Sequence, residues 1–254
     1  MSDDPFGVTL IYGAPGMGKT TLIVSALCEY ARYGTTLVLD LTGDIAIALN
    51  RECPDDQNVV LVSNSADYVR AKPKPGLFDS RPVGWGKGTH VVVGLSGSGR
   101  GTIAECVGLW TALATDRKHR REFVAAVCDE SEQLFSSGNH ISNELRESVL
   151  VARNERRSMV FATKRPTAVS TYFRSTARRA CVFKVLSDAD ARACDELGPS
   201  KLFRSAGKGV QYLPRGSYLY FSGSEHTPDD TLPVLDSRSP APWLRGASRF
   251  YRSK

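Results

Sequence analysis

An octapeptide close to the N-terminus has the residue types and spacing of a phosphate-binding loop. Residues 13–20 read Gly-Ala-Pro-Gly-Met-Gly-Lys-Thr, a full match to G-x-x-x-x-G-K-[ST]. The apolar run Val8–Tyr12 enters the loop and the helical pattern Lys19–Tyr33 leaves it, as this motif requires. Glycines let the backbone curl so that successive N–H groups point at phosphate oxygens, and the helix N-terminus adds partial positive charge. The expected nucleotide-binding residues are Gly13, Ala14, Pro15, Gly16, Met17, Gly18, Lys19, Thr20 and Thr21.

Two side chains of this loop have specific expected tasks. The Lys19 ammonium can reach the β- and γ-phosphates, and the Thr20 hydroxyl can ligate Mg²⁺. ATP and Mg²⁺ are therefore the predicted cofactors.

Two adjacent carboxylates follow a second apolar run, FVAAVCDE at Phe123–Glu130. At the carboxyl edge of a parallel sheet, such a strand brings Asp129 next to the phosphate loop, where it can hold the Mg²⁺ shell. Glu130 is then placed to accept a proton from an attacking water. Because a nucleotide kinase excludes water and needs no such base, the pair favours ATP hydrolysis; the alternative is that both residues only begin a turn. Glu132 is a lesser candidate and is expected to be exposed.

These residues must be positioned by short apolar runs that alternate with helical patterns. Little polar alternation within the runs indicates strands buried on both faces of a parallel sheet. Thr102 and Asp188 are expected to be N-caps, and Gly34 and Gly198 to stop helices. The predicted strands are Val8–Tyr12, Thr36–Leu41, Val59–Ser63, Thr89–Leu95, Phe123–Cys128, Ser158–Thr163 and Arg179–Val185, and the predicted helices are Lys19–Tyr33, Asp44–Arg51, Thr102–Arg120, Ser142–Glu155 and Asp188–Leu197.

This alternation predicts a three-layer α/β P-loop NTPase fold with a mostly parallel central sheet. Residues 1–222 are expected to form the ATPase domain, with a Pro/Gly-rich loop insertion at 71–88. Gly209–Pro214 and Ser217–Ser222 are predicted to pair as a C-terminal hairpin. Residues 223–254 form a Pro/Ser-rich, then basic and aromatic tail that is expected to be extended.

Composition excludes several classes of protein. The chain has 254 residues, 41% of them hydrophobic, and no stretch reaches the roughly 18 uncharged apolar residues of a membrane span. The N-terminus is acidic where a secretory signal is basic, so a soluble intracellular protein is expected. Cysteine and histidine spacing indicates neither a disulfide framework nor a zinc site. Residues 101–254 hold 24 basic and 17 acidic groups, which suggests a polyanionic partner, or a merely solvated cationic surface.

The segment from Arg153 to Leu213 resembles the FtsK/HerA superfamily of DNA-translocating ATPases. Arg153 is followed by a strand that ends in ATKRP, at Ala162–Pro166. Further matching runs are TAVSTYFRST, RRACVFKVLS, DADARACDELG and GKGVQYL. Together with the phosphate loop and Asp129-Glu130, the resemblance covers about residues 7–222. Lys164 stands where the family usually has Gln at its polar sensor, so it could contact the γ-phosphate, DNA or a neighbouring acid.

The resemblance implies a ring, typically a hexamer, with ATP bound between subunits. It nominates Arg153 as the arginine finger that acts on the neighbouring subunit's nucleotide, with Arg156 and Arg157 as competitors. A solvated helix end is the alternative for all three. Because the chain is short, it looks most similar to the small genome-packaging ATPases of membrane-containing icosahedral double-stranded DNA viruses. The resemblance then implies a location in the host cytoplasm or on the virion.

Other functions stay open at this point. They are a translocase of a plasmid or mobile element, a Zot-like phage assembly or extrusion ATPase, and a P-loop kinase. DNA, bound through its backbone without base reading, is the expected partner. The tail could instead dock on capsid-vertex or membrane-associated viral proteins. The expected DNA contacts are Arg117–Arg121, Arg174, Arg178, Arg179, the tail residues Arg245, Arg249, Arg252 and Lys254, and a 71–88 loop that carries Lys72, Lys74, Arg81, Trp85 and Lys87 into a ring pore.

Overall fold

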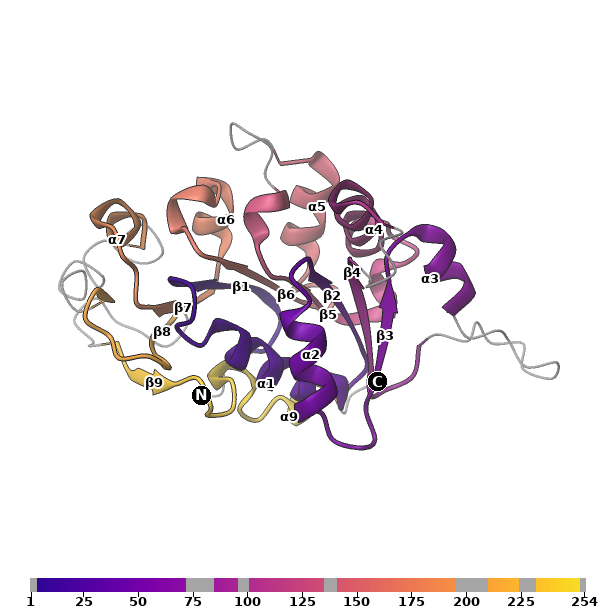
Figure 1. The fold of residues 1–254 in the computed structure, drawn as a ribbon, viewed down its shortest axis with the longest axis horizontal. Helices are drawn as coiled ribbons and strands as arrows, with labels where there is room; N and C mark the ends of the chain where they lie inside the picture. The colour runs from indigo at the N-terminus through magenta and orange to yellow at the C-terminus, as the bar shows by residue number, and fades with distance from the viewer. Residues whose placement is uncertain are drawn as a thin grey trace.

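A mostly parallel sheet runs through the whole protein. The computed structural model describes residues 4–71, 85–95, 101–134, 141–194, 210–223 and 232–251. Within these residues, nine strands form one sheet in the order β3-β4-β2-β5-β6-β1-β7-β8-β9 (Figure 1). The strands are β1 (Gly7–Tyr12), β2 (Thr35–Asp40), β3 (Asn58–Val62), β4 (Thr89–Gly94), β5 (Phe123–Cys128), β6 (Ser158–Thr163), β7 (Arg179–Phe183), β8 (Ser217–Ser222) and β9 (Val234–Asp236).

The strands from β3 to β7 pair in parallel, whereas β8 is antiparallel to both β7 and β9. Every residue of β1, β2 and β6 is buried. This confirms that apolar runs without polar alternation form strands covered on both faces. Each of the seven predicted strands is present, with ends that differ by at most two residues.

Helices cover both faces of this sheet, which confirms the three-layer α/β fold (Figure 1). Helices α1 (Lys19–Ala31) and α2 (Asp44–Glu52) lie on one face, and α4 (Ile103–Thr115), α5 (Asn143–Val151) and α6 (Thr171–Thr176) on the other. The shorter elements are α3 (Ser65–Ala71), α7 (Asp188–Cys194), α9 (Ser248–Tyr251) and the 3-10 turns Arg120–Glu122, Ser131–Leu134, Pro166–Ala168 and Pro242–Leu244. Among the helices that the structure describes, none has the length and apolar character that a membrane crossing requires.

The predicted helix ends hold in part. Thr102 caps α4, because its side chain accepts a hydrogen bond from the Glu105 N–H while the Glu105 carboxylate accepts one from the Thr102 N–H. At α7 the cap lies one residue earlier than predicted: Ser187, rather than Asp188, accepts from a helical N–H, that of Asp190. Gly198 lies outside the described residues.

Strand β1 lies between β6 and β7 in the sheet, whereas β2, the next strand along the chain, lies three places away from β1, beyond β6 and β5. The chain therefore leaves β1 through α1 and crosses over β6 and β5 to reach β2. Such a change of direction leaves a crevice outside the carboxyl end of the central strand, because the connections on its two sides diverge. The phosphate loop follows β1 at this point.

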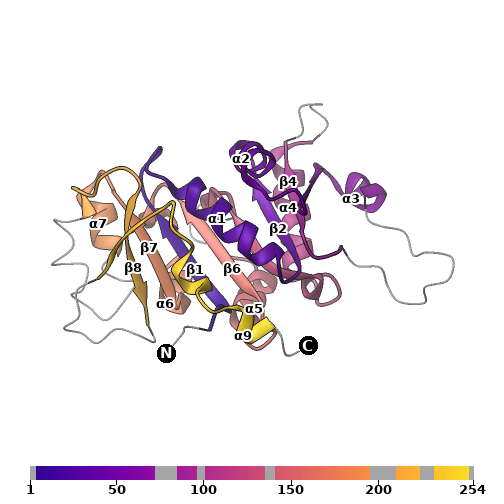
Figure 2. The same ribbon diagram turned by 90° about the horizontal axis from the view of Figure 1, so that it is seen from below.

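The C-terminal strands differ from the predicted hairpin. Residues 211–214 are not a strand, and β8 instead pairs with β7 on one side and with β9 on the other. After β9, the chain returns across the face that α1 covers (Figure 2). There the buried Trp243 donates a hydrogen bond from Nε1 to the Tyr30 hydroxyl at 2.9 Å, and Tyr251 stacks on Tyr33.

The described end of the 71–88 loop is part of the core. Trp85 is 9% exposed and packs beside Tyr68, and its carbonyl accepts a hydrogen bond from the Thr35 hydroxyl at 2.7 Å. The expectation that Trp85 projects into a ring pore is therefore wrong. Lys72, Lys74 and Arg81 lie outside the described residues.

Candidate functional site

The phosphate loop connects β1 to α1 in a shape that glycine permits. At Gly18 the backbone φ is +107°, in the left-handed region, and a Cβ would lie 2.8 Å from the Ser237 Oγ. A Cβ on Gly13 would lie 2.5 Å from the Phe183 Cβ. At Gly16, by contrast, a Cβ would meet no atom of the described residues within 4 Å, so within this part of the chain the middle of the loop is open. The loop is packed tightly at both ends and open where a ligand would approach.

The N-terminus of α1 keeps its backbone donors available. No side chain caps the helix, and its first turn contains no acidic residue. Backbone N–H groups that lack an intrahelical partner and the positive end of the helix dipole favour an anion at this place.

Lys19, the first residue of α1, is folded back over the loop. It is 7% exposed, and its Nζ donates hydrogen bonds to the Gly13 carbonyl at 2.7 Å and the Ala14 carbonyl at 3.1 Å. Burial lowers the pKa of Lys19, and the carboxylate of Asp129 opposes this effect. The ammonium is thus held beside the loop without a hydrogen bond to a carboxylate.

Asp129 follows β5, two strands away from β1 in the sheet. Burial raises its pKa to about 6, while the charge of Lys19 lowers it. Its backbone N–H donates to the Leu39 carbonyl at 3.2 Å, which fixes the turn after β5 against the end of β2. Asp40, at that end, caps α2: its two carboxylate oxygens accept from the N–H groups of Gly43 and Ala46. Sequence reasoning did not select Asp40, whose tasks in the structure are local.

Glu130 has φ +58°, a backbone conformation that is uncommon for a residue with a side chain. Its carboxylate forms an ion pair with Lys164, the residue that follows β6. The hydrogen bond to Glu130 raises the pKa of Lys164, so the lysine stays charged. Of the three partners that the sequence left open for Lys164, the structure shows the neighbouring acid. Glu132 is half-buried rather than exposed.

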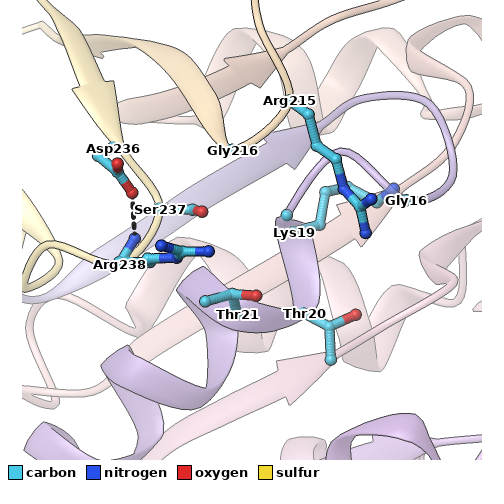
Figure 3. Close-up of a pocket in the computed structure, with 10 residues that line it drawn as sticks. Gly16, Lys19, Thr20, Thr21, Arg215, Gly216, Asp236, Ser237 and Arg238 are labelled. Carbon is cyan, nitrogen blue, oxygen red and sulfur yellow. Dashed lines mark hydrogen bonds between the residues drawn. The ribbon is translucent and has the colours of Figure 1, made fainter.

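The ends of β1, β5 and β6 thus bring Lys19, Asp129, Glu130 and Lys164 together. All four were selected from the sequence. A wall on the other side of the loop was not: a cavity of about 630 Å³ extends from the loop to the turns around β8 and β9 (Figure 3). It is lined by Gly16, Gly18, Lys19, Thr20, Thr21, Arg215, Gly216, Asp236, Ser237 and Arg238.

Arg153 lies at the amino end of the central strands, opposite the phosphate loop at their carboxyl end. It precedes β6, and its Cβ is 3.9 Å from the Cβ position of Gly7, the first residue of β1. Because a six-residue strand spans roughly 20 Å, the Arg153 guanidinium does not reach the phosphate loop of its own subunit. It forms an ion pair with Asp4 at 3.0 Å and is 55% exposed. Arg157 is buried and donates hydrogen bonds to the Ala114 and Arg120 carbonyls, which gives it a structural task.

Three of the arginines expected to contact DNA are buried. The guanidinium of Arg179 donates to Thr9 Oγ1 and to the Pro5 and Phe6 carbonyls, that of Arg174 donates to the Pro166 carbonyl, and Arg120 pairs with Glu155. These three predictions are wrong, because local sequence does not show which cations tie loops to the core. Arg117, Lys118 and Arg121 are exposed, as are Arg245 and Arg249, while Arg252 and Lys254 lie outside the described residues.

A strand, a glycine loop and a helix, with an acidic strand end two strands away at the same carboxyl end of a mostly parallel sheet, define the P-loop NTPase fold. The sequence matches no known protein-family model and no curated protein.

Comparison with solved structures bears out the fold-level resemblance. The genome-packaging NTPase B204 of Sulfolobus turreted icosahedral virus 2, solved with AMPPCP, matches with a TM-score of 0.60 at 14% identity, over 91% of this chain and 98% of that one. VirB4 of Thermoanaerobacter pseudethanolicus matches with a TM-score of 0.58 at 10% identity, over 87% and 90%. ATPases 2 and 3 of EssC from Geobacillus thermodenitrificans match with a TM-score of 0.51 at 9% identity, over 97% of this chain and 43% of that one.

Proposed function

We propose that the chain is an ATP-hydrolysing ring motor that translocates DNA, and that its task is to package a viral double-stranded DNA genome into a preformed capsid. The observation that carries the proposal is the grouping of Lys19, Asp129, Glu130 and Lys164 beside the phosphate loop. The viral task is supported by the fold shared with a genome-packaging NTPase along nearly the whole of both chains. The proposed setting is the host cytoplasm or the virion.

The residues present fit ATP and Mg²⁺. The loop has an open middle, an uncapped helix N-terminus and a buried ammonium, which are the features that a polyphosphate needs. Thr20 and Asp129 are the residues that would hold Mg²⁺, which commonly takes few protein ligands and shares phosphate oxygens. Bound there, the ion would neutralise charge that develops on the phosphates during hydrolysis.

The chain's own residues divide the remaining work. Lys19 would exchange its two neutral carbonyl partners for anionic phosphate oxygens, so that both donor and acceptor carry charge. Glu130 would orient the attacking water and accept its proton. For this the carboxylate must be free of Lys164, and Lys164 would then be available for the γ-phosphate. Arg153 would act on the neighbouring subunit, because its own phosphate loop is out of reach.

The experiment is a phosphate-release assay on the full chain with and without double-stranded DNA. We expect hydrolysis that rises with DNA and falls by about 10²-fold or more in Glu130→Gln, because general-base catalysis contributes about 10²–10⁴-fold. Glu144→Gln, an exposed carboxylate on α5, is the matched control and should keep the wild-type rate. Nucleotide binding should persist in Glu130→Gln.

Three outcomes would contradict the proposal at different levels. Hydrolysis at the wild-type rate in Glu130→Gln would remove this residue as the base. Transfer of phosphate to a small acceptor with negligible phosphate release would indicate a kinase. Hydrolysis that no DNA stimulates, in a ring that ATP merely holds together, would indicate an assembly ATPase.

A further inference from the structure

The turns before β8 and after β9 are joined to the phosphate loop by backbone hydrogen bonds. The Gly216 N–H donates to the Met17 carbonyl at 3.0 Å, and the Ser237 N–H donates to the Gly216 carbonyl at 2.7 Å. Ser237 is buried, and its Oγ fills the space that a Cβ on Gly18 would need. The two turns therefore form a fixed wall of the cavity, built from the same subunit as the loop.

Two arginines of this wall have no side-chain partner among the described residues. Arg215 and Arg238 are both exposed and both line the cavity. Asp236 does not neutralise Arg238 through the side chain, since its carboxylate accepts from the Arg238 backbone N–H at 2.8 Å.

Some exposed arginines of the chain pair with acids, as Arg32 does with Glu29, Arg51 with Glu52 and Arg70 with Asp67, whereas no such pair is formed by Arg215 or Arg238 within the part of the chain that the structure describes. Two unpaired guanidinium groups on one cavity add to the positive charge of Lys19 and the helix N-terminus. This concentration of charge favours a polyanion.

The two arginines point to different parts of the cavity. In Figure 3, Arg215 extends toward Gly16 and Lys19, where the loop N–H groups would hold a phosphate chain. Arg238 extends toward Thr21, at the end of the cavity that β9 closes. A phosphate chain held by the loop would occupy the end of the cavity beside Gly16 and Lys19. A volume of about 630 Å³ is enough for a whole nucleotide, so the end beside Arg238 has room for the nucleoside.

We propose that Arg215 binds the phosphate chain of the nucleotide and that Arg238 packs its guanidinium on the nucleoside, both within one subunit. The inference rests on the proposed ATP-binding function. A planar guanidinium suits each task, because it donates two parallel hydrogen bonds to phosphate and also stacks on aromatic rings such as a base. Arg215 and Arg238 are thus nucleotide-binding residues separate from the arginine finger, which comes from a neighbouring subunit.

The test compares the binding of two probes to the full chain by calorimetry: ATP with Mg²⁺, and inorganic tripolyphosphate with Mg²⁺, which has no nucleoside. Arg215→Ala should weaken both probes about tenfold or more, because the loss of even one charge-assisted hydrogen bond has that effect. Arg238→Ala should weaken ATP about tenfold and leave tripolyphosphate within about twofold. Arg32→Ala is the control for net charge, because Arg32 is an exposed arginine just after the far end of α1.

Each result decides a separate point. If wild type binds ATP, and both cavity variants bind it as Arg32→Ala does, the inference is overturned while the proposed function stands. Equal weakening of both probes by Arg238→Ala would overturn its assignment to the nucleoside. A wild-type chain that binds neither probe would overturn the proposed function and this inference together. Thermal unfolding of each variant checks the fold, which the loss of exposed Arg215 or Arg238, without a side-chain partner among the described residues, should not disturb.

Discussion

At the scale of single residues, the site keeps charged groups out of water. Burial lowers the pKa of Lys19 and raises that of Asp129, because it disfavours the charged form of each group. The opposite charge of the other group partly offsets this effect. Glu130 adds an uncommon backbone conformation. Such features reduce stability and persist where the surrounding structure enforces them, which is frequent at functional sites.

In the absence of metal and nucleotide, Asp129 makes the stability of the fold depend on pH. Its folded-state pKa of about 6 lies above the ordinary aspartate pKa of 3.8, so between these pH values the native state binds more protons than the unfolded state. The free energy of unfolding therefore rises as pH falls through 6. At neutral pH the ionised Asp129 carboxylate destabilises the fold. Asp129→Asn should raise the free energy of unfolding by about 1–3 kcal/mol at pH 7.5, while impairing ATP hydrolysis.

The measurement is urea unfolding of wild type and variant at pH 7.5 and at pH 4.5. The gain should be smaller at the lower pH, where Asp129 in the folded wild type is protonated. Asp55→Asn, which changes an exposed carboxylate, is the control and should shift stability little at either pH. A variant that is less stable than wild type at pH 7.5 would show that Asp129 stabilises the fold through its charge.

At the scale of elements, the C-terminal segment supports the cavity wall that is formed by the turns before β8 and after β9. The segment after β9 is anchored by Trp243, whose ring lies buried beside Tyr220 and whose Nε1 donates to Tyr30 on α1. Since β9 pairs with β8 over only three residues, we expect this anchor to help hold the strand in place, beside the hydrogen bond from the Ser237 N–H to the Gly216 carbonyl. The position of Ser237 and Arg238 at the cavity therefore depends on a contact at the other end of the segment.

We therefore expect Trp243→Phe to destabilise the chain more than Trp110→Phe. Both tryptophans are fully buried, so both changes remove the same ring atoms from the core. Within the described residues Trp110 Nε1 has no hydrogen-bond partner, whereas Trp243→Phe removes the hydrogen bond that the buried Tyr30 hydroxyl accepts from Nε1. The difference should be about 1–2 kcal/mol in urea unfolding. Equal losses would indicate that the hydrogen bond adds nothing to the anchor.

Strand β9 also shows which parts of the fold and of the site could be predicted from the sequence and which could not. The phosphate loop and Asp129-Glu130 are local patterns at the ends of buried strands, and the strands that lead into them, β1 and β5, were predicted to within one residue. Strand β9 contains only Val-Leu-Asp and exists because β8 lies beside it. The sequence instead predicts that β8 pairs with the nearer residues 209–214. Arg215 and Arg238 could not be placed at the site without that distant pairing. The short helices α3 and α6 were missed for a related reason, since six or seven residues carry little periodicity.

At the scale of the whole molecule, the site is incomplete within one chain if hydrolysis needs an arginine finger. The phosphate loop lies at the carboxyl edge of the sheet and Arg153 at the amino edge. In a head-to-tail ring, one edge of each subunit can face the other edge of its neighbour. Arg153→Ala should therefore abolish hydrolysis and leave ATP binding close to wild type. Asp4→Asn removes the ion-pair partner but keeps the guanidinium, so it should stay active.

Mixing two inactive variants tests this arrangement directly. An Arg153→Ala subunit retains Glu130 and the phosphate loop, and a Glu130→Gln subunit retains Arg153. Where the second subunit follows the first in a ring, their shared interface contains every group that the proposal requires. Random mixing in equal amounts places an intact site at roughly one interface in four, so mixed rings should regain hydrolysis in that proportion if the sites act independently. Each variant alone, taken through the same dissociation and reassembly, is the control and should remain inactive. If Arg153 instead acted within its own subunit, no mixture would contain an intact site, and rings that stay inactive although both variants are shown to co-assemble would exclude a shared interface.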